Sequence, residues 1–205
     1  TSQLPYITLK IAHSIDGKIA LNNFSSKWIT GDSSRKYVHK LRSEYDAVIV
    51  GSNTAKYDDP SLDVRDVKGR NPYRIVIDRD LKLSGKLKLF SDCNRIRTIV
   101  LTGETNRSNV ISNSVKTIFI KEKSGKLDLK DALKKLFKLN IASVLVEGGA
   151  NLYSQFIRND LFDDAYVFIA PKIIGKGISS FGDYEITSLD KAKSLKEKML
   201  FWKRN

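Results

Sequence analysis

Apolar and polar positions along the chain repeat with two different periods. Short runs rich in β-branched residues predict strands at 6–12, 47–50, 74–77, 98–101, 116–120, 143–146 and 165–169. Apolar residues at helical spacing predict helices at 35–45, 128–139 and 150–158, with Ser33 and Ser34 as caps of the first. Because strands and helices alternate, the pattern predicts an α/β fold with a mainly parallel central sheet flanked by helices.

No repeat, low-complexity tract or linker interrupts this pattern, so residues 1–205 are predicted to form a single domain. A loop is expected at 58–60, because Pro60 lacks an N–H group and disfavours helix in the residue before it. The apolar run at 199–202 predicts a terminal strand. The chain begins with Thr1 rather than methionine, which favours a domain taken from a longer protein.

Composition argues against several classes of protein. No apolar run approaches the about 20 residues that span a bilayer, so no membrane association is expected. The single cysteine, Cys93, cannot form an internal disulfide and fits a reducing compartment, so a cytoplasmic location is expected. The two histidines, His13 and His39, form no cluster with zinc-ligand spacing, so no metal site is expected.

The formal net charge of +13 has two interpretations. It favours anionic partners, which are phosphorylated metabolites or nucleic acid. It is also typical of lysine-rich helix faces in solvent, and much of the excess lies in 121–138 and 191–203, where lysines alternate with apolar and acidic residues. A basic nucleic-acid-binding domain is therefore an alternative of another class. No nucleic-acid partner is expected, since no RNA-recognition aromatic motif, helix-turn-helix signature or zinc finger is present.

Polar chemistry is concentrated where predicted strands end. Glu147 ends the strand at 143–146, Gly148 and Gly149 follow, and a helix then begins. Glycines let the backbone approach a ligand closely, and the free N–H groups of a helix start favour a phosphate. An ordinary tight turn is the alternative for the glycines, but a carboxylate at the end of a buried strand needs a polar partner or a ligand.

Two further segments carry candidate binding groups. After the strand at 47–50, Thr54 and Asp58 could bond a ribose or an amide, and Arg42 and Arg65 could hold a phosphate. Loop capping and surface salt bridges are the alternatives. In the first strand, Lys10 faces opposite to Leu9 and Ile11, so it lies either in solvent or in a site. Trp28 could form a pocket wall or an anchor in the core.

Eight segments, taken in order, resemble the reductase domain of bacterial riboflavin-biosynthesis deaminase/reductases. They are 8–20, 28–31, 38–42, 46–51, 58–60, 74–78, 145–149 and 170–175. The resemblance covers 5–178 and implies a dihydrofolate-reductase-like fold, a homodimer and NADPH as the cofactor. It implies hydride transfer to ribosyl C1′ of 5-amino-6-(5-phosphoribosylamino)uracil, which opens the sugar. The non-deaminated diaminopyrimidine is an alternative substrate.

The resemblance also implies roles for individual residues. The cofactor would be lined by Ala12, Trp28, Thr54, Asp58, Gly149, Ala150, Asn151, Leu152, Tyr153, Ser154 and Gln155. The substrate would be faced by Ser26, Arg42, Leu62, Arg65 and Glu147. Lys10 would approach the ribose, and Lys10 or Glu147, directly or through water, would protonate or polarise the opening sugar.

This chain departs from the family pattern at Arg79, where a small hydroxyl residue is usual. An arginine there would hold the adenosine 2′-phosphate or point into solvent. In the family this domain is often joined to an upstream zinc deaminase. That unit needs His-x-Glu and Pro-Cys-x-x-Cys motifs, and neither is present. The chain is therefore not expected to deaminate, and a fused upstream deaminase domain is expected in a longer protein.

Overall fold

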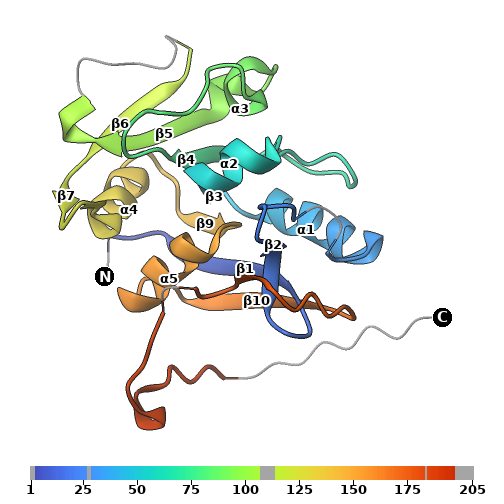
Figure 1. The fold of residues 1–205 in the computed structure, drawn as a ribbon. Helices are drawn as coiled ribbons and strands as arrows, with labels where there is room; N and C mark the ends of the chain where they lie inside the picture. Colours follow the sequence, from blue (N-terminus) through green and yellow to red (C-terminus); the bar gives the residue numbers. More distant parts are fainter. Residues whose placement is uncertain (1–2, 27–28, 107–113, 183, 197–205) are drawn as a thin grey trace.

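A seven-stranded sheet forms the centre of the molecule. The computed structural model describes residues 3–26, 29–106, 114–182 and 184–196. In spatial order the strands are β10 (Asp164–Ala170), β1 (Tyr6–Ser14), β9 (Ser143–Val146), β3 (Ala47–Gly51), β4 (Tyr73–Ile77), β5 (Thr98–Gly103) and β6 (Lys116–Ile120). Every neighbouring pair in this sheet is parallel, which confirms the predicted architecture (Figure 1).

Helices cover both faces of the sheet. The longer ones are α1 (Asp32–Glu44), α4 (Leu129–Phe137) and α5 (Ala150–Arg158), close to the predicted ranges. The predicted capping of α1 by Ser33 and Ser34 is wrong. Gly31 is the N-cap and both serines lie inside the helix, because the helix begins one residue before them.

Several short elements have no counterpart in the predicted pattern. They are β2 (Lys18–Leu21) and β11 (Gly177–Ser179), which pair antiparallel, β7 (Glu122–Lys123) and β8 (Lys126–Leu127), α2 (Ser52–Asp58), α3 (Lys88–Ser91), and the 3₁₀ turns Arg95–Arg97, Glu104–Asn106 and Leu189–Lys191. Most of them are too short for a periodic pattern. The predicted loop at 58–60 starts where α2 ends, and Asp59 there has a φ of 39°.

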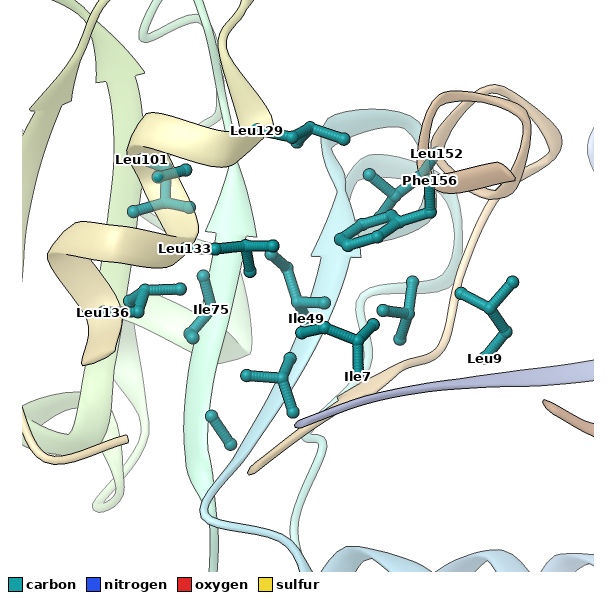
Figure 2. Packing of buried hydrophobic residues seen from close by; sticks show 14 of the residues in the cluster. Ile7, Leu9, Ile49, Ile75, Leu101, Leu129, Leu133, Leu136, Leu152 and Phe156 are labelled. Carbon is teal, nitrogen blue, oxygen red and sulfur yellow. The ribbon is translucent and has the colours of Figure 1, made fainter. Parts of the chain in front are cut away.

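Alternating residues of the strands supply two hydrophobic clusters, one on each face. On one face, α4 and α5 pack against Ile49 and Ile75, and Figure 2 shows Leu133 and Phe156 directed toward these strand residues. On the other face, Leu41 of α1 and other helix residues pack against strand residues such as Val48. Because both faces are covered, the strands are almost continuously apolar, as a parallel sheet requires.

The start of α4 is held by a side-chain cap, which gives a first prediction. Asp128 accepts hydrogen bonds from the backbone N–H groups of Lys130 and Asp131, at 2.9 and 3.1 Å. Asp128→Ala is expected to lower the free energy of unfolding by about 1 kcal/mol, since two helix N–H groups lose their acceptor. Urea denaturation checks this, with Asp128→Asn as the control that caps almost as well. Equal losses in both variants would contradict a capping role.

Among the described residues, no helix combines the length and the apolar character needed to cross a membrane. The same residues contain no group of three or more His, Cys, Asp or Glu side chains arranged to hold a metal ion. The predicted terminal strand at 199–202 and the candidate residue Trp28 lie outside the described residues.

Candidate active site

A cavity of about 580 Å³ lies at the carboxyl ends of the central strands. Ala12 of β1, Gly51 of β3, Ile77 of β4 and Glu147 after β9 all line it. Residues of α2, α5 and the β2–α1 connection line it as well. Parallel strands carry their side chains and loops to one common edge, so residues far apart in sequence meet there.

Three ionised side chains meet beside this cavity, and we call Lys10, Arg42 and Glu147 the charge cluster. Lys10 and Glu147 line the cavity, and Arg42 lies behind Glu147. Arg42 donates from Nε to Glu147 Oε1 at 2.5 Å and from Nη2 to Oε2 at 3.0 Å. Lys10 Nζ lies 3.7 Å from Glu147 Oε2. The side chain of Glu147 is 5% exposed and that of Lys10 is 16% exposed, so solvent screens these interactions weakly. Arg42 and Lys10 are therefore the polar partners that the Glu147 carboxylate requires at the end of a buried strand.

Burial and the neighbouring charges shift the pKa values of Glu147 and Lys10. Burial alone would raise the pKa of Glu147, but the neighbouring Arg42 and Lys10 cations outweigh it and hold that pKa below its ordinary value. Burial lowers the pKa of Lys10, and Arg42 lowers it further, while Glu147 only partly offsets these effects. With two cations and one carboxylate, the cluster carries a net positive charge. Lys10, which lines the cavity, holds its proton less tightly than an exposed lysine.

The glycine turn before α5 faces the same cavity. Gly149 has a φ of 86°, in the left-handed region that side chains disfavour. A Cβ on Gly148 or Gly149 would stand 3.0 or 3.2 Å from Thr54 Oγ1. No side chain caps the start of α5, so its first N–H groups are available to an anionic ligand. Glycine is therefore required for close approach between this turn, α2 and a ligand.

Gly149→Ala is expected to weaken the binding of an anionic nucleotide about 10-fold or more. Placing a Cβ at a φ of 86° costs about 1–2 kcal/mol and crowds Thr54, which distorts the turn. The matched control is Gly17→Ala, because Gly17 also has a positive φ, of 74°, but a Cβ there meets nothing within 4 Å. Titration calorimetry measures the affinity of each variant for the nucleotide. Equal affinities in both variants would refute a binding role for the turn.

The predicted site residues fall into two groups. Those that line the cavity are Lys10, Ala12, Ser26, Thr54, Asp58, Glu147, Gly149, Ala150, Asn151, Leu152, Tyr153 and Gln155. Ser26 donates to Asp58 Oδ1 at 2.7 Å, which joins the β2–α1 connection to α2. The hydroxyl of Tyr153 donates to the Lys10 carbonyl oxygen at 2.6 Å, so it ties α5 to β1. Contacts of these residues with a ligand stay predictions.

The remaining predicted residues that the structure describes do not line the cavity. Arg42 lies behind Glu147, and Ser154 is 1% exposed on the core side of α5. Leu62 is buried in the core at 3% exposure, with a φ of 52°. Arg65 is exposed, and its Nη1 lies 2.6 Å from Asp63 Oδ1. Arg42 Nη1 donates to the backbone carbonyl oxygen of the same residue, at 3.2 Å. Asp63 therefore contacts both arginines. Arg79 is exposed, bonded to the Asp80 carboxylate and the Gly125 carbonyl oxygen.

Several residues of the cavity wall were not predicted from the sequence. Phe24 and Tyr57 line it with stacked rings, and Arg35 at the start of α1 lines it as well. Ile178 of β11 arrives from a distant part of the chain, through pairing with β2. No local pattern marks these positions, because each depends on a contact between segments that are not neighbours in sequence.

The fold and the cavity together define a class of protein. A parallel α/β sheet places a glycine turn and a helix start beside a buried charge cluster, and this arrangement is chemically suited to a phosphorylated small molecule. The chain belongs to the RibD C-terminal domain family, whose model matches residues 5–201. The resemblance based on the motifs is thereby confirmed.

Sequence relatives agree with this membership. A riboflavin biosynthesis protein RibD of Aquifex aeolicus is 40% identical over 201 residues, which make up 97% of this chain and 55% of that protein. The chloroplastic riboflavin biosynthesis protein PYRR of Arabidopsis thaliana is 34% identical over 200 residues, or 95% of this chain and 33% of that protein. The chain thus spans about half the length of the bacterial relatives it matches.

Solved structures agree with the fold. The crystal structure of a diaminohydroxyphosphoribosylaminopyrimidine deaminase/5-amino-6-(5-phosphoribosylamino)uracil reductase from Thermotoga maritima superposes with a TM-score of 0.81 at 35% identity, over 93% of this chain and 51% of that one. The Saccharomyces riboflavin biosynthesis reductase Rib7 superposes with a TM-score of 0.76 at 24% identity, over 93% and 84%, and shows the fold alone. The predicted dihydrofolate-reductase-like fold is confirmed.

Proposed function

We propose that this chain is an NADPH-dependent reductase of riboflavin biosynthesis. It would reduce the ribosyl group of 5-amino-6-(5-phosphoribosylamino)uracil to the ribityl product. The observation that carries the proposal is the charge cluster beside a cavity that the glycine turn of α5 also lines. The names of the Thermotoga and Aquifex relatives support the reaction and the pathway.

The residues of the cavity fit a nicotinamide dinucleotide. The space that a Cβ on Gly148 or Gly149 would fill, together with the uncapped start of α5, suits the pyrophosphate. Thr54 and Asp58 would hold its ribose and amide groups from α2. Bound there, the cofactor supplies the hydride. For the 2′-phosphate that separates NADPH from NADH, Arg79 is the candidate cation, since it is exposed and its present bonds are to the adjacent Asp80 and to a backbone carbonyl.

The chain's own residues would handle the proton of this reaction. When the ribosyl C1′–O4′ bond opens and C1′ accepts the hydride, O4′ must gain one proton. Lys10 is placed to deliver it, because it lines the cavity and burial lowers the pKa of its ammonium group. Solvent then returns a proton to Lys10. Glu147 keeps Lys10 charged and in position while Arg42 holds Glu147 through two hydrogen bonds.

The substrate phosphate needs a separate cation. Arg42 is committed to Glu147, so it stabilises the site from behind the carboxylate. Arg65 is exposed, and its partner is Asp63, in an ion pair that solvent screens and that a phosphate can displace. The side chains of Ser26 and Glu147 and the backbone at Leu62 would complete the substrate contacts predicted from the resemblance.

The wider context of the protein is also a proposal. Relatives about twice as long favour fusion to a deaminase domain in the complete protein, and a cytoplasmic location is expected. We also expect a homodimer. The edge strand β10 exposes Val167 and Ile169, at 50% and 64%, and Ile173 beyond it is 78% exposed. Apolar residues along an edge strand are a liability unless another chain covers them.

A direct assay tests the proposed reaction. The protein is mixed with NADPH and either the deaminated or the non-deaminated phosphoribosylamino-pyrimidine, and the absorbance of the reduced nicotinamide is followed. Loss of absorbance with the deaminated compound supports the proposal, whereas loss only with the other supports the alternative substrate. No oxidation with either, combined with tight and strongly salt-dependent oligonucleotide binding, would favour a nucleic-acid-binding domain instead.

A further inference from the structure

Two aromatic side chains stack against each other in the wall of the cavity. Phe24, in the β2–α1 connection, and Tyr57, on α2, have ring centroids 4.2 Å apart and ring planes inclined by 1°. Both residues line the cavity, and they are 37% and 45% exposed. In such a stacked pair each ring covers one face of the other, and the partial exposure of both rings leaves outer surface accessible to a ligand in the cavity.

The backbone at Phe24 makes this arrangement unusual. Its φ is 66°, in the left-handed region where a side chain is disfavoured and glycine is the usual residue. The strained turn is closed by a hydrogen bond from the Phe24 N–H to the Leu21 carbonyl oxygen, at 2.9 Å. The Phe24 side chain keeps 37% of its surface exposed at this strained position, so full burial of the ring does not explain the strain. Strain of this kind at the wall of a cavity points to a functional demand on the ring.

The surroundings hold the pair in place and add charge to it. Ser26, two residues after Phe24, donates to Asp58, the residue after Tyr57, at 2.7 Å. The loop and α2 are therefore joined at two adjacent points, which limits how far the rings can separate. Lys56 Nζ lies 5.3 Å from the centroid of the Tyr57 ring. A cation beside an aromatic face suits a planar ring that carries a phosphate group nearby.

We propose that Phe24 and Tyr57 form a stacking platform for a planar heteroaromatic ring of a bound ligand, either the adenine of the cofactor or the pyrimidine of the substrate. The proposal rests on the proposed function, which supplies both rings. Stacking of a base on an aromatic side chain tolerates many ring types, because every base has a π-face. The platform would set affinity and ring orientation, while the charge cluster performs the chemistry.

The test compares two ligands on four variants. The variants are Phe24→Gly, Tyr57→Ala, the conservative Tyr57→Phe, and the control Phe137→Ala, which removes a ring of the same 37% exposure outside the cavity. Calorimetric titration with 2′,5′-ADP reports the adenine end of the cofactor without any turnover. The KM for the pyrimidine substrate at saturating NADPH reports the other ring.

We expect Phe24→Gly and Tyr57→Ala to weaken one of these two ligands roughly 5–100-fold, with Tyr57→Phe and Phe137→Ala close to wild type. Weakened 2′,5′-ADP binding identifies adenine as the stacked ring, and a raised KM with unchanged 2′,5′-ADP affinity identifies the pyrimidine. Phe24→Gly relieves the strain at a φ of 66° but removes the stacked ring, so melting temperatures are measured alongside and affinities are compared where every variant is folded.

A change below about 2-fold for both ligands in both ring-removing variants would overturn the platform, since loss of stacking should cost more than that. So would an equal loss in the Phe137→Ala control. The proposed function is tested separately, on the wild-type protein alone, and absence of NADPH oxidation with either pyrimidine would contradict it. The platform is tested by the differences in affinity and KM between the wild type and its variants.

Discussion

Glu147→Gln is expected to lower the free energy of unfolding by about 3–5 kcal/mol and to reduce turnover by about 10²–10⁴-fold. The substitution keeps the size of the side chain but removes its charge. Arg42 and Lys10 then remain in a buried site without a counter-charge. Urea denaturation measures the first effect, and NADPH oxidation at saturating substrate measures the second.

A triple variant separates the two effects. Lys10→Met combined with Arg42→Met and Glu147→Leu removes the whole charge cluster rather than one charge of it, and such exchanges are often neutral for stability. It should therefore recover much of the unfolding free energy and none of the activity. Glu147→Gln with a wild-type urea midpoint would show that the charge cluster does not stabilise the fold.

The stability difference between wild type and Glu147→Gln should depend on pH. The pKa of Glu147 in the folded protein lies below its ordinary value of 4.5. Its contribution to stability is therefore fully present above pH 4.5 and is lost as the pH falls through the folded-state pKa. The unfolding free energies of the two proteins should converge in acid. A difference that stayed constant from pH 7 into that range would exclude the ionised carboxylate as the cause.

Lys10→Ala is the second large effect, with turnover expected to fall about 10²–10⁴-fold because the proposed proton donor is removed. Steady-state kinetics should place the loss in kcat, since Lys10 is assigned to proton delivery at O4′. Lys18→Ala is the matched control. It removes a lysine whose Nζ donates to Ser179 Oγ at 2.9 Å and which is absent from the cavity wall. Near-normal turnover of Lys10→Ala would remove Lys10 from this role.

The pH profile of the wild-type enzyme gives an independent readout of Lys10. A general acid must be protonated, so activity is lost as the pH rises through its pKa. Burial lowers the pKa of Lys10 below the ordinary 10.5, so the alkaline limb of kcat should lie below that value. The limb should be missing from whatever activity Lys10→Ala retains. An unchanged alkaline limb in the variant would assign it to another group.

The sequence by itself determined the class of fold. Each strand of the central sheet carries a run of β-branched residues such as 47–50 or 143–146, and a pattern of this strength survives almost any environment. The motif residues Lys10 and Glu147 were also predictable, because a charged side chain inside or directly after an apolar strand is costly to bury unless it has a partner or a ligand. Parallel connectivity then brings the carboxyl ends of these strands to one edge, where the cavity lies.

Only the tertiary structure decided which groups are partners. Arg42 was predicted to face the substrate phosphate, which stays a prediction, and the fold joins it to Glu147, 105 residues away, at 2.5 Å, a pairing that no local pattern indicates. Phe24 and Tyr57 carry no signal in the sequence, since their stacking exists only once the β2–α1 connection lies against α2. Local patterns determine which elements form, because backbone propensity and apolar period act over a few residues. Distances between side chains of separate elements depend on packing and desolvation of the whole chain, so they are settled only in the folded protein.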